Sequence, residues 1–188
     1  GLEPEFPAAA LAQLTTITGP GHDEGPHIRN LTALPWCSID NDDSLDLDQL
    51  TACEPLAGGA VKIFVAVADV DVLVTKGSAI DRHAWTNTTS VYTSARVFAM
   101  LPERLSTDLS SLNPGQDRLA IVTEMVVAPD ASITQSTVYR ATVRNHAQLA
   151  YDALSAWIDG GGALPDAVRA IAGLDLQLRT QDAVAQQL

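Results

Sequence analysis

The chain has 188 residues, of which 46% are hydrophobic, so it can bury a sizeable core as one domain or slightly more. Its 23 acidic and 11 basic residues give a net charge of −12, which argues against a broad basic surface for nucleic acid. A nucleic-acid enzyme remains compatible with this charge, because bound divalent cations or a further, basic part of the protein could supply local positive charge.

The first half of the chain predicts a lead-in segment followed by strands. The first thirty residues are rich in proline and glycine and contain one short helical candidate, at residues 8–14. An apolar, partly β-branched run from Leu31 predicts a strand that ends near Asp40, and the acidic residues after it predict a loop. Residues 60–70, AVKIFVAVADV, form the clearest strand, and we expect both of its faces to be covered.

The second half predicts a short helix, a hairpin and a longer helix. Ser78 is a suitable N-cap for the short helix, with Asp81 placed three residues later as in a capping box. Residues 120–128 and 132–144 predict two strands joined by a PDA turn. Residues 145–158 then predict a helix that ends at a run of glycines.

The last residues show a helix-like apolar spacing over residues 168–178 that reaches the end of the sequence without a cap, so we expect a longer protein. The order of predicted elements favours a mixed α+β fold with a largely antiparallel sheet flanked by helices.

Cysteine usage and hydropathy indicate the compartment. Cys37 and Cys53 have no neighbouring cysteine or histidine, so we expect free thiols in a reducing, cytosolic compartment rather than a zinc site. No apolar run reaches the length of about 18 residues that a membrane span needs, and the first residues lack the basic region and long apolar core of a secretory signal. The sequence therefore predicts a cytoplasmic protein with no membrane partner.

Residues 38–50, SIDNDDSLDLDQL, hold five aspartates: Asp40, Asp42, Asp43, Asp46 and Asp48. Carboxylates at this density repel one another unless they are solvated, protonated or neutralised by cations. A solvated loop is the ordinary interpretation of such a run. However, Asp46 and Asp48 alternate with leucines that favour burial, and in an extended backbone the two carboxylates would point to one face. Half-buried carboxylates need a cation.

Two kinds of metal site are alternatives to the solvated loop. A calcium loop that starts at Asp40 does not fit, because Leu45 stands at position six, where glycine is needed, and Thr51 stands at position twelve, where glutamate is needed. A magnesium site that hydrolyses a phosphodiester would need only a few hard carboxylate ligands. Spacing alone leaves the solvated loop and the magnesium site open.

Several motifs occur in a fixed order. The segment RNLTALPWCSIDNDDSLDLDQL is followed by VAVADVDVLVTKGSAID, TSVYTSARVFAMLPERLSTDLSSLNPGQDRLA and AQLAYDALSAWI. Together they span residues 29–158 and resemble the catalytic (RNB) domain of the ribonuclease II and ribonuclease R family. From this resemblance we expect residues 1–30 to be a lead-in or linker segment and residues 31–188 to be the N-terminal half of an RNB domain.

The resemblance implies a cytoplasmic 3'-to-5' exoribonuclease that hydrolyses single-stranded RNA to nucleoside 5'-monophosphates. It implies Mg²⁺, or alternatively Mn²⁺, no organic cofactor and no particular oligomeric state. Asp40, Asp46 and Asp48 match three of the family's four active-site aspartates, and Asp48 matches the one on which cleavage depends most. Tyr92 matches a residue that stacks near the RNA 3' end, and Tyr151 matches one that helps to distinguish ribose from deoxyribose. Without the family, both tyrosines would be read as half-buried aromatic residues with a satisfied hydroxyl.

The sequence departs from the family pattern at two positions. Gln49 replaces the fourth aspartate, and its neutral amide offers only one carbonyl oxygen to a metal ion. We keep Gln49 in the expected ligand set, with a catalytically impaired RNA-binding protein as the alternative. Asn87 stands where the family usually has arginine, which would remove a phosphate contact. Asp69 and Arg118 also match family positions and are expected to be structural.

Overall fold

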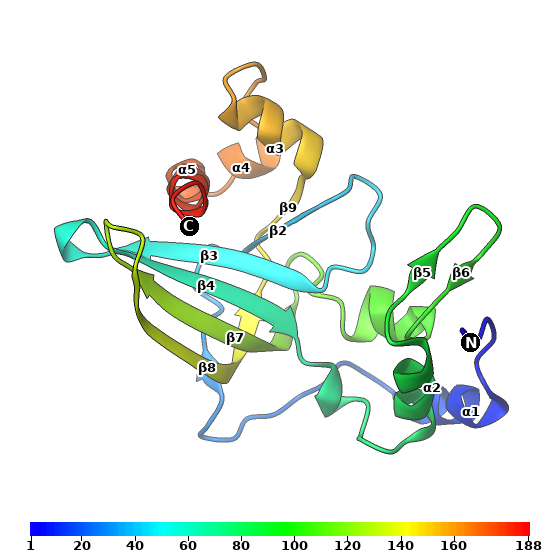
Figure 1. Ribbon diagram of the computed structural model, residues 1–188. Helices are drawn as coiled ribbons and strands as arrows, with labels where there is room; N and C mark the ends of the chain where they lie inside the picture. The colour runs from blue at the N-terminus through cyan, green and yellow to red at the C-terminus, as the bar shows by residue number, and fades with distance from the viewer.

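A seven-stranded sheet is the centre of the computed structural model, which describes residues 1–188 (Figure 1). Its order is β1-β8-β7-β4-β3-β2-β9, and β5 and β6 form a separate hairpin. The strands are β1 (Arg29–Asn30), β2 (Cys37–Asp40), β3 (Gln49–Pro55), β4 (Val61–Ala68), β5 (Val91–Tyr92), β6 (Val97–Phe98), β7 (Asp117–Val127), β8 (Ile133–Arg144) and β9 (Ala147–Ala150).

Five helices and three short helical turns accompany the strands. The helices are α1 (Ala8–Thr16), α2 (Ala79–Asn87), α3 (Tyr151–Ile158), α4 (Asp166–Arg169) and α5 (Leu174–Ala185). The short turns are η1 (Ala57–Gly59), η2 (Val70–Val72) and η3 (Leu105–Leu109). No helix is long and apolar enough to cross a bilayer.

The sheet confirms the predicted fold class. Its four inner pairings, β2–β3, β3–β4, β4–β7 and β7–β8, are antiparallel, and only the outer pairings β1–β8 and β2–β9 are parallel. The strands predicted over residues 60–70, 120–128 and 132–144 appear as β4, β7 and β8. The predicted cap of α2 is also confirmed, because the Asp81 amide donates to the Ser78 hydroxyl at 3.3 Å.

Three hydrophobic clusters hold these elements together. The largest lies on one face of the sheet, where Trp36 and Phe64 meet edge to face with 6.0 Å between their ring centroids. A second joins α3, α4 and α5 to β2 and β9, around Trp157 and Leu174. The third packs α1 and α2 against η3, around Ile80. In Figure 1 the two helical groups accordingly lie at different sides of the sheet, with the N-terminus beside α1 and α2.

Burial of β4 differs from the prediction. Phe64 and Ala66 are buried, but Ile63 and Val65 on the other face are only partly buried and Val67 is 48% exposed. The expectation that both faces are covered is therefore wrong for this chain, because α5 packs on the neighbouring strand β3 instead.

The helix predicted over residues 145–158 is also wrong in its first part. Residues 147–150 form β9, in which buried Ala147 and Leu149 alternate with exposed Gln148. Sheet pairing overrides the local helical pattern here, because β2 offers a free edge with which β9 pairs in parallel. The C-terminal helical pattern is interrupted as well, at Gly173, whose φ of 78° separates α4 from α5.

Candidate functional site

The end of the sheet at β3, β2 and β9 gathers the predicted site residues. Asp40 is the last residue of β2 and Gln49 is the first residue of β3, so the acidic loop of residues 41–48 joins the two strands at this end. Asp40 is also the register partner of Ala150, and Tyr151 follows Ala150 directly as the first residue of α3. Figure 1 shows the β2–β3 loop on the side of the β5–β6 hairpin.

The acidic loop is fixed through its backbone. The Leu47 amide donates to the Ser111 hydroxyl at 3.1 Å, and the Leu47 carbonyl accepts from the Leu112 amide at 2.8 Å. These bonds hold the Leu47 side chain in the core at 1% exposure, while Asp46 and Asp48 on either side are exposed. The alternation predicted from the Leu-Asp spacing is therefore present at Leu47, but not at Leu45, which is 65% exposed. Ser111 is a supporting residue that the sequence interpretation did not single out.

Asp40 has an unusual electrostatic environment. Burial raises the pKa of its carboxyl group, and the charges of Asp48 and Asp46 raise it further. Its Oδ2 atom is buried and has no hydrogen-bond partner. A buried carboxylate oxygen without a donor, beside two further carboxylates, is stabilised either by a proton or by a cation.

The donor set is one that suits a hard divalent cation. Asp40, Asp46 and Asp48 offer carboxylate oxygens and Gln49 offers an amide oxygen, which are the ligand types that Mg²⁺ and Mn²⁺ prefer. The structure contains no preformed group of three or more acidic, histidine or cysteine side chains converging on one point. Mg²⁺ is compatible with such an open arrangement, because it usually keeps several waters and takes only one or two carboxylates from the protein.

Tyr92 is brought to the acidic loop from the β5–β6 hairpin. Its hydroxyl donates to Asp46 Oδ2 at 3.2 Å, across 46 positions of sequence. Burial raises the pKa of the Tyr92 phenol, and the charge of Asp46 and the bond to it act in the same direction. Because the residue is nevertheless 68% exposed, its ring is available to a ligand at this site.

Gln49 and Tyr151 lie at the same end of the sheet, but neither side chain forms a hydrogen bond with the aspartates. The Gln49 backbone pairs with Val67 in β4, and its exposed side chain makes no hydrogen bond. Tyr151 is 47% exposed and its hydroxyl is also without a partner. The structure thus joins Tyr92 to Asp46 by a hydrogen bond and places Asp46 and Asp48 near enough for their charges to act on Asp40, while Gln49 and Tyr151 lie at the same end of the sheet.

The three remaining family positions have structural surroundings. Asn87 is completely buried and its hydrogen-bond partners lie within the protein, which is compatible with the expected loss of a phosphate contact at this position. Asp69 is 4% exposed and forms an ion pair with Arg140 at 2.9 Å, as expected for a structural residue. Arg118 is 7% exposed and donates to the Asp108 carbonyl at 3.3 Å.

The amino-acid sequence is similar to those of known proteins over most of its length. Residues 28–188 match the RNB domain. Ribonuclease R of Vibrio cholerae is 36% identical over 168 residues, which cover 89% of this chain and 20% of that protein. The chain therefore spans about a fifth of the length of this curated relative.

Solved structures show the same fold. Mycoplasma genitalium RNase R in complex with double-stranded RNA superposes with a TM-score of 0.82 and 26% sequence identity, over 98% of this chain and 33% of that one. Yeast Ssd1, a pseudonuclease, superposes with a TM-score of 0.64 and 17% identity, over 81% of this chain and 20% of that one. Since a pseudonuclease also has this fold, the fold alone does not establish catalysis.

Proposed function

The chain belongs to the RNB domain family, and on that premise we propose that it forms part of a 3'-to-5' exoribonuclease acting on single-stranded RNA. The observation that carries the proposal is the partnerless buried oxygen of Asp40 beside Asp46 and Asp48, with the exposed ring of Tyr92 hydrogen-bonded to the same cluster. Groups of this kind suit metal-assisted hydrolysis of a phosphodiester at the end of a stacked strand.

In this proposal Asp40, Asp46 and Asp48, with Gln49 in the fourth position, hold Mg²⁺ or, alternatively, Mn²⁺. When bound, the cation polarises the phosphate and lowers the pKa of water. Asp48 is the proposed catalytic residue: its carboxylate accepts a hydrogen bond from the attacking water and orients it toward the terminal phosphate. Attack by water at that phosphorus breaks the bond to the 3' oxygen of the preceding nucleotide and releases a nucleoside 5'-monophosphate.

Two tyrosines position the RNA end. The exposed ring of Tyr92 stacks on a base, an interaction of about 1–3 kcal/mol that does not depend on base identity. Its hydroxyl restrains Asp46 at the same time, so the stacking platform and one metal ligand are fixed relative to each other. Tyr151, at the start of α3, borders the terminal nucleotides in the proposal and contacts the ribose.

Cleavage of a labelled RNA tests the proposed function. A full-length preparation in Mg²⁺ is expected to shorten a 5'-labelled single-stranded RNA from its 3' end and to release 5'-mononucleotides. Asp48→Asn should lower the rate about a hundredfold or more, in the range that loss of a group orienting the attacking water gives. Asp42→Asn, an exposed residue of the same loop, is the matched control and should leave the rate unchanged. A wild-type protein that leaves the RNA intact would refute the proposal.

Gln49 favours a second candidate, an RNA-binding protein with impaired catalysis. Its amide adds no negative charge to the ligand set, which lowers the expected affinity for a divalent cation. Under this alternative, Gln49→Asp should create or strongly raise hydrolysis. Gln135→Asp, an exposed change near the opposite end of the sheet, should not. Rapid cleavage by the unmodified protein would eliminate this candidate.

A further inference from the structure

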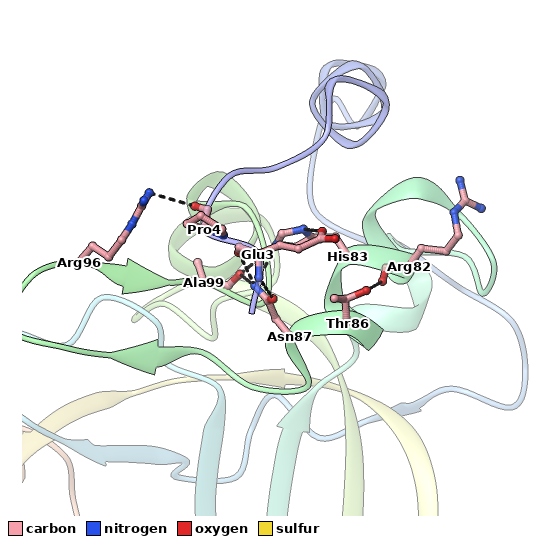
Figure 2. Close-up of polar contacts among 8 residues, drawn as sticks. All are labelled: Glu3, Pro4, Arg82, His83, Thr86, Asn87, Arg96 and Ala99. Atoms are coloured by element: carbon pink, nitrogen blue, oxygen red, sulfur yellow. Dashed lines mark hydrogen bonds and ion pairs between the residues drawn. The ribbon is translucent and has the colours of Figure 1, made fainter. Parts of the chain in front are cut away.

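Residues 3–6, which we call the N-terminal strap, lie against α2 and the β5–β6 hairpin (Figure 2). The Glu3 amide donates to Asn87 Oδ1 at 2.8 Å, and Asn87 Nδ2 donates to the Glu3 carbonyl at 2.9 Å. The Asn87 carboxamide therefore satisfies both backbone groups of Glu3, much as a neighbouring strand would. Because Asn87 has no exposed surface, water does not compete for these bonds.

The strap is also tied to the base of the hairpin. Asn87 Nδ2 donates to the carbonyl of Ala99, the residue that follows β6, at 3.0 Å. Beside it, Nδ1 of buried His83 lies 3.3 Å from the Glu3 carboxylate, and the Phe6 ring packs on the His83 ring with 4.2 Å between the centroids. One buried amide thus joins the end of α2, the strap and the end of the hairpin.

The tip of the hairpin is held by the same strap. Arg96 lies in the turn between β5 and β6, and its guanidinium pairs with the Glu5 carboxylate at 2.6 Å and donates to the Pro4 carbonyl at 3.3 Å. The turn itself is closed by Thr93, whose hydroxyl donates to the Arg96 carbonyl at 2.7 Å. The strap therefore contacts the hairpin at both of its ends.

The hairpin needs this support. Each of its strands is two residues long, and such a hairpin has little stability of its own in water. It is joined to α2 through Thr88, a β-branched residue with a φ of 61°, a conformation that persists only where surrounding contacts determine it. Tyr92, which pairs with Val97 in the hairpin, is the residue that reaches Asp46.

We infer that the N-terminal strap is a positioning element for the RNA 3' end, and that Asn87 and Arg96 are positioning residues that act through Tyr92. They set the Tyr92 ring beside the acidic loop without touching RNA themselves. This inference rests on the proposed function, because it assigns the RNA end to Tyr92. It gives the lead-in segment a role in substrate binding.

RNA binding in the presence of EDTA tests the strap apart from hydrolysis. The full-length protein is titrated into a fluorescein-labelled single-stranded oligoadenylate, and Kd is read from anisotropy. Arg96→Ala should raise Kd about two- to fivefold, the range that follows from the loss of one exposed ion pair. Arg169→Ala is the matched control, since it breaks an exposed pair with Asp166 at 2.7 Å in α4, and it should leave Kd unchanged. The exchanged pair Glu5→Arg with Arg96→Glu should restore the wild-type value.

A double-mutant cycle separates positioning from general stabilisation. In a Tyr92→Ala background, Arg96→Ala should cause no further rise in Kd, because the strap acts through a ring that is already gone. Additive effects of the two changes would overturn the inference, as would an unchanged Kd in Arg96→Ala alone or a wild type that binds no RNA. Failure of the wild type to shorten RNA in Mg²⁺ is a separate result. It would refute the proposed nuclease while the binding ratios still decide the role of the strap.

Discussion

Replacement of Asp40 by asparagine is expected to stabilise the protein in the absence of divalent cations while it removes a proposed metal ligand. The carboxyl pKa of Asp40 is raised by burial and by the charges of Asp48 and Asp46, and Oδ2 has no partner. Ionised Asp40 is therefore unfavourable in the folded state when no cation is present. Asparagine has nearly the same size and carries no charge, so it relieves the repulsion without leaving a cavity.

The size of the gain follows from the burial of the group. A buried polar atom left without a hydrogen bond costs about 1–3 kcal/mol. Because Asp40 is only partly buried and the asparagine amide is itself polar, we expect the low end, about 1 kcal/mol at pH 7. For a domain of this size that gain raises Tm by roughly 2–4 °C. Asp43→Asn, an exposed change in the same loop, should leave Tm unchanged.

Thermal unfolding with and without Mg²⁺ checks both parts of this prediction. Trp36 and Trp157 are 0% and 8% exposed in two different hydrophobic clusters, so their fluorescence reports on the loss of packing. Mg²⁺ at about a hundred times its Kd should stabilise the wild type by about 2.7 kcal/mol and Asp40→Asn by much less. A variant that melts below the wild type in EDTA refutes the argument from uncompensated charge. An equal Mg²⁺ shift in both proteins refutes Asp40 as a ligand.

Three other predictions concern the scaffold. Burial raises the pKa of Glu124, but hydrogen bonds, including one of 2.6 Å from the Tyr139 hydroxyl, outweigh it and lower that pKa overall. Glu124→Gln should therefore lower the unfolding free energy by about 1 kcal/mol at pH 7. In urea unfolding, the difference between wild type and variant should disappear as pH falls from 4.5 through the lowered pKa of Glu124. Ala131 has a φ of 68°, a left-handed backbone conformation that is strained for alanine, so Ala131→Gly should raise the unfolding free energy by about 1 kcal/mol. A variant with a lower unfolding free energy than the wild type would contradict this strain. Burial raises the thiol pKa of Cys37 and Cys53 to about 11, so alkylation at pH 8 should require unfolding.

The sheet centre was predictable because its signals are local. The apolar, β-branched run of β4 predicts a strand by itself, and the turn between β7 and β8 has residues that favour turns. The alternation of Asp46, Leu47 and Asp48 is of the same kind. Each of these predictions needs only the spacing of apolar and polar residues along the strand and the free-energy cost of exposing apolar side chains to water.

Non-local contacts account for what the sequence did not predict. Residues 147–150 carry an acceptable helical pattern, and only the free edge of β2 makes them a strand. The contact between Tyr92 and Asp46 and the burial of Asn87 under Glu3 depend on how separate elements dock. The acidic loop itself remained ambiguous by spacing, and its interpretation as a metal site came from the resemblance to a family.

The backbone of Gln49 is fixed by strand pairing, whereas its side chain is free to contribute to the proposed site. Its backbone pairs with Val67, and the Asp48 carbonyl beside it accepts from the Ala68 amide at 2.9 Å, so the course of the chain here is set by β3 and β4. The Gln49 side chain is exposed and makes no hydrogen bond. A carboxylate at this position would therefore add a negative charge to the proposed ligand set without disturbing the loop that holds Asp46. Within the proposed function, the charge of this one side chain therefore separates the nuclease from the RNA-binding alternative, whereas the pairing of β3 with β4 does not depend on it.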